Sequence, residues 1–259
     1  MRPLTFTIFF FWLLCCTSVA DDKILKVGAF DWPTKSEAGG GGAYFDLLKR
    51  IYEPHGYRIE PSSMGIDEAL GSLYRGNIDL MLAEWHPRHL QQDASIQAKL
   101  LTAPFFPIDT EYVVVLMPHK SSYHWEELLA DAGMRLAWVE GYDYHQYLDL
   151  RQHTFDTVDS SWKGIRMVSS GKLDAFIDDL DDVRIAMMRP GARELKFRRE
   201  VILVRNLYPL FQNKASGHAL SELYDEGLEA LISNGEVHDI YRRHDLNWER
   251  VKFLRPHLY

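Results

Sequence analysis

Residues 169–179 read Ser-Ser-Gly-Lys-Leu-Asp-Ala-Phe-Ile-Asp-Asp, and this stretch decides the fold of the 259-residue chain. Gly171 is typical of a helix end, because glycine adopts the left-handed backbone conformation at little cost. The apolar run at 173–177 predicts a short strand. Asp178 and Asp179 follow that run directly. The stretch therefore predicts a helix end, a strand, and acidic side chains at the carboxyl end of the strand.

Residues 74–84 repeat this pattern without a gap. They also contain a helix end, a glycine, an aliphatic–Asp pair, an apolar strand and an acid, so Glu84 corresponds to Asp179. In open α/β sheets, ligands bind outside the carboxyl ends of the strands, which is where both acids lie. The repeat predicts two similar half-domains that face one cleft. The alternative is that the two segments are similar only because any two βα units end their helices with the same types of residue.

Helices and strands alternate along the rest of the chain, which predicts βαβ units and a largely parallel sheet. The helices are recognised by apolar residues at helical spacing and the strands by short apolar runs. Strands are predicted at 24–30, 57–61, 78–83, 112–117, 135–139, 173–177 and 201–204, and helices at 44–52, 66–74, 125–129, 144–150, 165–170, 220–231 and 237–242.

The composition is that of a globular protein, with 46% hydrophobic and 25% charged residues. This excludes disordered, collagen-like and coiled-coil chains. The formal net charge of −8 argues against a nucleic-acid-binding protein, which would carry a basic stripe. It also argues against a protein held on an anionic membrane surface by charge.

The first twenty residues are predicted to be a secretory signal peptide. Arg2 precedes an apolar run at 6–14, and Ser18 and Ala20 fit a signal-peptidase site, so we expect cleavage after Ala20. The run is short for a membrane anchor, which needs about 20 residues. Both cysteines, Cys15 and Cys16, lie in this segment. We therefore expect an exported, periplasmic protein without disulfides or thiolate metal sites.

Four stretches together make the chain resemble the family 3 extracellular solute-binding proteins. Residues 26–33 are similar to the opening strand of that family and its aromatic/proline loop. Residues 42–48 resemble its Gly-aromatic-x-x-Asp-Leu helix start, with the aromatic displaced. Residues 171–179 resemble its Gly-x-x-Asp-Ala-x-x-x-Asp motif, and residues 228–244 its helix–Gly–helix ending. The resemblance covers essentially all of residues 23–245.

The resemblance implies a type II periplasmic-binding fold, in which two lobes, each a mixed, mostly parallel sheet flanked by helices, close around a ligand. Lobe 1 would comprise residues 23–115 and 206–259, and lobe 2 residues 116–205, with a hinge near Met117 and Arg205. The implied function is binding of a small polar solute, an amino acid or an amine, for uptake by an ABC-type permease or for signalling to a membrane receptor. We expect a monomer that needs no cofactor.

Three candidate site residues carry charge. The resemblance places Asp179 where amino-acid-binding members hold the ligand ammonium, and a buried cation needs such a fixed anion. In amino-acid-binding members, a Thr-Pro-x-Arg segment at this place supplies an arginine that binds the ligand carboxylate with two hydrogen bonds. Arg88 is the corresponding arginine, but it follows Pro87 directly. The alternative is that Arg88 is a surface arginine. Because Glu84 corresponds to Asp179, two acids facing the cleft predict a positively charged or zwitterionic ligand.

Aromatic residues at strand ends and helix starts are further candidates, because such side chains line clefts and stack on ligands. Core or hinge packing is the alternative for each of them. The candidates are Phe30, Trp32, Tyr44, Trp85 and Tyr142.

Metal and enzyme signatures are weak in this sequence. His86 and His89 flank Pro87 without an evident third ligand, so we expect no metal site there. The chain lacks a Gly-x-Ser-x-Gly elbow and a His-Glu-x-x-His motif. The second function considered is a periplasmic, dehydratase-like enzyme on the same scaffold, with Glu84 or Asp179 as the acid.

Overall fold

The computed structural model describes residues 23–83, 100–102, 105–142, 144–146, 148, 150 and 153–251. The predicted signal peptide and the residues Glu84, Trp85 and Arg88 lie outside these ranges. Among the described residues, no helix is long and apolar enough to cross a membrane.

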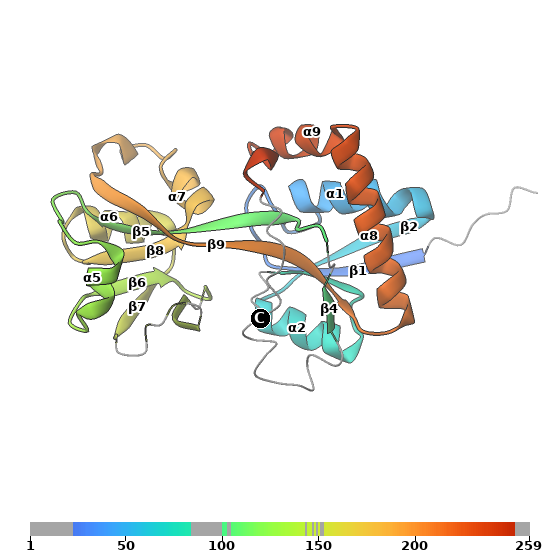
Figure 1. Cartoon of the computed structure of the whole chain (residues 1–259), viewed down its shortest axis with the longest axis horizontal. Helices are drawn as coiled ribbons and strands as arrows, with labels where there is room; N and C mark the ends of the chain where they lie inside the picture. Colours follow the sequence, from blue (N-terminus) through green and yellow to red (C-terminus); the bar gives the residue numbers. More distant parts are fainter. Residues whose placement is uncertain are drawn as a thin grey trace, which may run out of the picture.

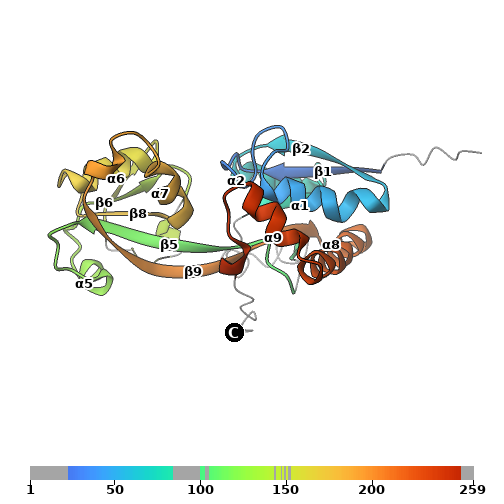
Figure 2. The ribbon, with the colours of Figure 1, turned by 90° about the horizontal axis from the view of Figure 1, so that it is seen from above.

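The chain forms two lobes joined by two long strands (Figures 1 and 2). The first lobe contains the N-terminal strands and the two C-terminal α-helices. The second lobe contains the elements that lie between the two long strands along the chain. The elements of the first lobe are β1 (Lys23–Ala29), α1 (Ala43–Tyr52), β2 (Tyr57–Ser63), α2 (Ile66–Arg75), β3 (Leu80–Ala83), β4 (Leu100–Thr102), α8 (Ala215–Ser233) and α9 (Glu236–Arg243). Those of the second lobe are α5 (Trp125–Ala130), β6 (Leu136–Val139), β7 (Phe155–Val158), α6 (Ser161–Ser169), β8 (Ala175–Asp179) and α7 (Leu180–Ala186).

The two joining strands are β5 (Asp109–Pro118) and β9 (Phe197–Gln212), which pair antiparallel along their length. The predicted lobe boundaries at 115/116 and 205/206 fall inside these strands and stay a prediction. Glu111 and Arg205 face each other in this ladder and form a buried ion pair. The connection between the lobes is therefore a hydrogen-bonded ribbon with a charge pair inside it.

The strand order is β2-β1-β3-β9-β5-β8-β6-β7, with β4 added beside β9. Pairing is parallel among β1, β2 and β3 and among β6, β7 and β8. It is antiparallel wherever β5 or β9 takes part. The sheet is thus mixed, as the resemblance implied, whereas the alternation of helices and strands predicted a largely parallel sheet; the antiparallel pairs all involve the two joining strands.

Each lobe buries its own apolar core. In the first lobe, α1 packs against α8, and Leu47, Leu48 and Leu228 are fully buried. In the second lobe, β5 alternates its side chains between two clusters, with Val115 in one and Val114 in the other. A strand buried on both faces reads as a continuous apolar run, which explains why β5 stands out in the sequence.

The internal repeat recurs as equivalent contacts. Gly76 and Gly171 both end helices with positive φ angles of 79° and 73°. Asp79 accepts a hydrogen bond from the backbone of Lys26 at 3.0 Å, and Asp174 accepts one from the backbone of Arg135 at 2.9 Å. Each aspartate thus ties the strand that follows to its parallel neighbour, so the repeat has a structural basis in both lobes.

Some predicted elements differ from the structure. Among the described residues of the helix predicted at 144–150, only Tyr144–Gln146 form a helical turn, of the 3-10 type. There Trp138 packs edge-on against the ring of Tyr144. Strand β7 and helix α7 were not predicted, because β7 exposes most of its residues and α7 begins in an acidic run. Strand β9 is also much longer than the apolar segment at 201–204.

Candidate functional site

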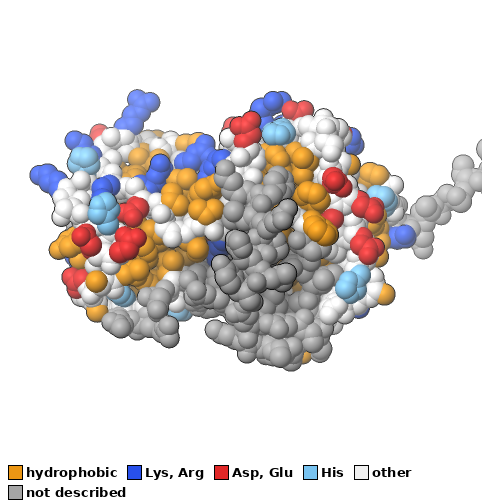
Figure 3. Space-filling model, in the orientation of Figure 1, with side chains coloured by type: hydrophobic (Ala, Val, Ile, Leu, Met, Phe, Trp, Pro, Cys, Tyr) orange, Lys and Arg blue, Asp and Glu red, His pale blue; other side chains and the backbone are white. Residues whose placement is uncertain are grey.

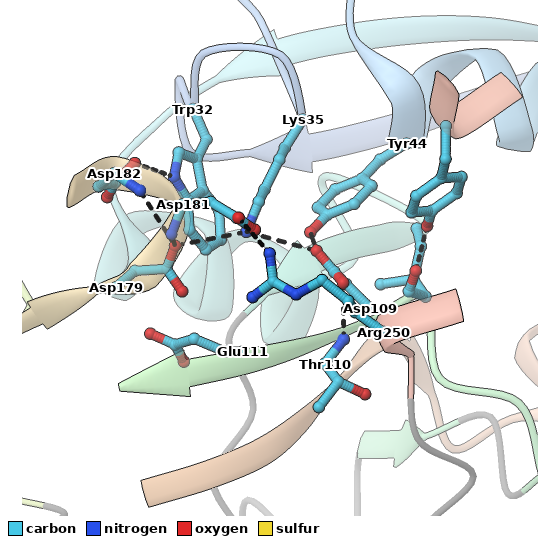
Figure 4. Close-up of polar contacts among 12 residues, drawn as sticks. Trp32, Lys35, Tyr44, Asp109, Thr110, Glu111, Asp179, Asp181, Asp182 and Arg250 are labelled. Carbon is cyan, nitrogen blue, oxygen red and sulfur yellow. Dashed lines mark hydrogen bonds and ion pairs between the residues drawn. The ribbon is translucent and has the colours of Figure 1, made fainter. Parts of the chain in front are cut away.

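A buried lysine lies between the lobes. Lys35 belongs to the loop that joins β1 to α1, and its side chain is 1% exposed. Its Nζ lies 3.3 Å from Asp109 on β5, and 3.7 Å and 3.9 Å from Asp181 and Asp179 of the second lobe. The close-up shows the lysine reaching from its loop into the middle of these acids (Figure 4). Lys35 therefore connects the first lobe, a joining strand and the second lobe.

Asp179 caps helix α7 from the end of β8. Its Oδ1 accepts hydrogen bonds from the backbone amides of Asp181 at 2.7 Å and Asp182 at 3.3 Å. Acidic N-caps satisfy amide groups that have no partner within the helix. The other oxygen of Asp179, Oδ2, has no hydrogen-bond partner among the described residues. Asp179 therefore combines a structural role with one buried, unsatisfied oxygen.

Two further contacts cross from lobe to lobe. The Trp32 indole donates a hydrogen bond from Nε1 to Asp182 at 3.0 Å, and Tyr142, from within the second lobe, donates to the same carboxylate. Arg250, from the chain after α9, pairs with Asp181 at 2.6 Å. Among the described residues, the first turn of α7 thus carries the acids of the second lobe that pair with the first lobe (Figure 4).

Burial and charge shift the pKa values in this cluster. Burial opposes the charge of Lys35, but Asp179, Asp109 and Asp181 outweigh it and raise its pKa above the usual value. Burial raises the pKa of Asp179 well above its usual range, and Lys35 only partly offsets this. The pKa of Asp181 is lowered, because Lys35 and Arg250 outweigh the effect of burial. Lys35 is therefore a cation in a region with an excess of acid.

Four of the predicted aromatic residues line one pocket. Phe30, Trp32 and Tyr44 reach it from the first lobe and Tyr142 from the second. Ile66, Leu82, Ile108 and Leu207 add apolar walls, and Ser36 is a polar neighbour. The pocket holds about 30 Å³ of enclosed free space, and the wider space at its mouth is open to solvent. The structure thus brings together aromatics that are far apart in the sequence, on a pocket with walls from both lobes.

Other predicted residues are not placed. Glu84, Trp85 and Arg88 lie outside the described residues, so their prediction as site residues stays untested. His86 and His89 also lie there. The described residues contain no group of three or more His, Cys, Asp or Glu that could hold a metal ion.

Sequence reasoning missed Lys35, Asp109 and Arg250. Lys35 lies in a polar loop, and Arg250 follows the last predicted helix, so both read as surface residues. The signal that could have found Asp109 is its position three residues before the apolar run at 112–117, at the start of β5. Tyr44, which the sequence did single out, donates a 2.6 Å hydrogen bond to Asp109.

Acidic and basic side chains are interspersed on the visible surface of both lobes (Figure 3). The feature that distinguishes the molecule is the buried cluster between the lobes, rather than its outer charge.

Comparison with family models and with curated proteins gives no match. Solved structures do match. A histidine kinase sensor domain with similarity to periplasmic binding proteins superposes with a TM-score of 0.67 and 16% identity, over 88% of this chain and 99% of that one. The substrate-binding protein of an amino acid ABC transporter gives a TM-score of 0.61 and 14% identity, over 85% and 98%. The ancestral amino acid-binding protein AncCDT-1, a precursor of cyclohexadienyl dehydratase, gives 0.63 and 17%, over 85% and 94%.

These superpositions establish the fold. Over most of its length, the chain matches amino-acid solute-binding proteins in structure and has the mixed α/β, periplasmic-binding-protein-like fold.

Proposed function

We propose that the protein binds a small polar solute of amino-acid size between its two lobes, for uptake through an ABC-type permease or for sensing. The observation that carries this proposal is the pocket with walls from both lobes, beside a buried acidic cluster. Ligand pockets are commonly apolar clefts with a few fixed polar groups. The matched structures include an ABC-transporter substrate-binding protein and a sensor domain, so both contexts are part of the proposal.

The sequence favours an amino acid or an amine as the ligand, and this stays a prediction. Asp179 is buried at the end of β8, as an ammonium-binding acid would be. Lys35 already faces that acid, so a ligand ammonium would share the cluster with it. A screen must therefore compare solutes with and without an amino group.

Thermal unfolding of the purified protein with amino acids, polyamines, betaines and small organic acids tests the proposal. A ligand that binds the folded state stabilises it by RT ln(1 + [L]/Kd), about 2.7 kcal/mol at one hundred times Kd. We expect at least one solute to raise the melting temperature in a saturable way and to be recovered unchanged. No stabilisation by any of these classes would contradict the proposal.

Phe30 provides a test that the pocket is the site. Its side chain is 38% exposed at the pocket, and Phe155 is 38% exposed in the second lobe, outside the pocket lining. We expect Phe30→Ala to weaken binding of the identified solute at least about tenfold, the order expected from losing aromatic contact area. Phe155→Ala is the matched control and should leave the affinity unchanged. Equal effects of the two substitutions would place the ligand elsewhere.

The second candidate is a dehydratase-like enzyme. It is favoured by the match to a dehydratase precursor and by the raised pKa of Asp179, because a raised pKa eases the proton uptake that a general acid needs between turnovers. Incubation of stabilising solutes with the protein, followed by mass spectrometry, distinguishes the two functions. A product 18 mass units lighter would favour the enzyme, since loss of water defines a dehydration.

A further inference from the structure

The ammonium of Lys35 is surrounded by three carboxylates and the face of an aromatic ring. Its Nζ lies within 4 Å of Asp109, Asp179 and Asp181 and 3.8 Å from the centre of the Trp32 ring. Anions on several sides and an aromatic face are the surroundings in which proteins hold ligand cations. Nζ makes no hydrogen bond within the described part of the chain, and neither does Asp179 Oδ2. The Lys35–Asp179 pair, which joins Nζ to Oδ1 at 3.9 Å, is thus held by charge and burial.

The backbone of Lys35 is fixed in this position. Its amide donates to Trp32 at 3.1 Å, and its carbonyl accepts from the amide of Tyr44 at 2.9 Å. Gly42 packs against the same carbonyl with a φ of 87°, and a Cβ on Gly42 would come within 2.5 Å of that oxygen. The loop therefore presents the lysine side chain toward the acids as part of its own fold.

We propose that Lys35 is a specificity-determining residue: its own ammonium fills the subsite bounded by Asp109, Asp179 and Asp181, so that the adjoining pocket takes small solutes that have an apolar body and lack an ammonium group. The ligand class rests on the proposed function, whereas the filled subsite does not. A second ammonium near Lys35 would be repelled in a place where water screens little. The pocket walls are mainly aromatic and aliphatic, which suits an apolar body.

Chemical rescue tests the filled subsite directly. Lys35→Ala removes three carbons and the ammonium, the atoms of n-propylammonium. We expect the melting temperature of Lys35→Ala to fall by about 6 °C or more, because the buried acids lose their counter-ion. Added n-propylammonium should restore part of this loss in a saturable way. It should not stabilise the wild type, in which the subsite is already filled.

The controls separate this effect from general salt effects. Sodium chloride and tetramethylammonium at equal concentration should not rescue Lys35→Ala. Lys163→Ala removes an exposed lysine that pairs with Asp159, and should show neither the loss nor the rescue. The proposal of a filled subsite would be overturned if n-propylammonium left the melting temperature of a folded Lys35→Ala variant unchanged. It would also be overturned if n-propylammonium stabilised the wild type.

Matched ligand pairs test the specificity, and they need no variant. L-phenylalanine and 3-phenylpropionate differ only in the amino group, as do L-glutamate and glutarate. In the wild type we expect the amino-free member of any pair that binds to be at least about tenfold tighter, because the amino acid must place its charge beside Lys35. Tighter binding of the amino acid would overturn the proposal, even if Lys35→Ala failed to fold. If no solute binds but the rescue succeeds, the proposed function fails and the filled subsite stands.

Discussion

At the scale of single residues, buried charges determine how the molecule responds to pH. Asp179 and Asp178 lie at the end of β8 with less than 2% of their surface exposed. Burial raises the pKa of both carboxyls well above the usual range. Asp225 on α8 is a simpler case, because burial raises its pKa to about 6 and no buried cation is involved.

Asp225→Asn is expected to stabilise the protein at pH 8 by about 1 kcal/mol, after allowance for a half-buried group. The native carboxyl keeps its proton up to about pH 6, whereas in the unfolded chain it ionises near 3.8. The native state therefore binds more protons in that window, and the wild type loses stability as the pH rises through it. Because asparagine cannot ionise, the stability of the variant does not fall in this pH range.

Urea unfolding at pH 4 and pH 8 checks this expectation. The variant should gain stability over the wild type at pH 8 and show little difference at pH 4. Asp156→Asn, at an exposed position on β7, is the control for removing one negative charge. A gain of the same size at both pH values would mean that the titration of Asp225 is not the cause.

At the scale of elements, close backbone contacts determine how helices attach to strands. Helix α8 begins directly after β9, and Gly217 in its first turn touches the end of that strand. A Cβ at this position would lie 1.9 Å from the carbonyl oxygen of Gln212. Because the obstacle is backbone, it cannot move aside as a flexible side chain would.

Gly217→Ala is therefore expected to destabilise the protein by about 2 kcal/mol, the middle of the range for overpacking. The sign of this change in unfolding free energy is informative, because replacing glycine by alanine inside a helix usually stabilises a protein by about 0.5–1 kcal/mol. Gly65→Ala is the control, because its Cβ meets nothing within 4 Å. Denaturant unfolding measures both, and a stabilised Gly217→Ala would show that α8 docks less closely than the structure indicates.

At the scale of the whole molecule, a few polar contacts hold the lobes together. They are the Lys35 cluster, the Trp32–Asp182 hydrogen bond and the Arg250–Asp181 pair. Within the described part of the chain, β5 and β9 also link the lobes, and their antiparallel ladder runs from one core to the other. Such a connection suits hinge closure around a ligand.

Arg250→Ala is expected to shift the molecule toward a more open arrangement, because Asp181 loses one of its interlobe partners. Small-angle scattering should show a larger radius of gyration than the wild type, and a saturating ligand should reduce it. Arg242→Ala is the control, since Arg242 is exposed and pairs only with Asp239 among the described residues. An unchanged radius in Arg250→Ala would mean that the other contacts suffice to hold the lobes closed.

Local sequence patterns determined much of the fold. Three kinds of pattern depend only on neighbours within one or two helical turns. They are the helix-ending glycines Gly76 and Gly171, the apolar strands that follow them, and the apolar faces of α1, α2 and α8. The same local chemistry produced the repeat at 74–84 and 169–179, and with it the expectation of two lobes. The fold implied by the resemblance is confirmed by the solved structures that match the chain.

Only the tertiary structure decided what the acids face. Asp179 was predicted to lie at a strand end, but its partner Lys35 is far away in the sequence, in a loop whose composition reads as solvent-exposed. Whether a lysine is solvated or buried depends on which strands and lobes surround it, and no periodicity encodes that. The chain alone therefore determined where acidic groups gather, while the packing of the two lobes determined that one of their counter-ions is the protein's own lysine.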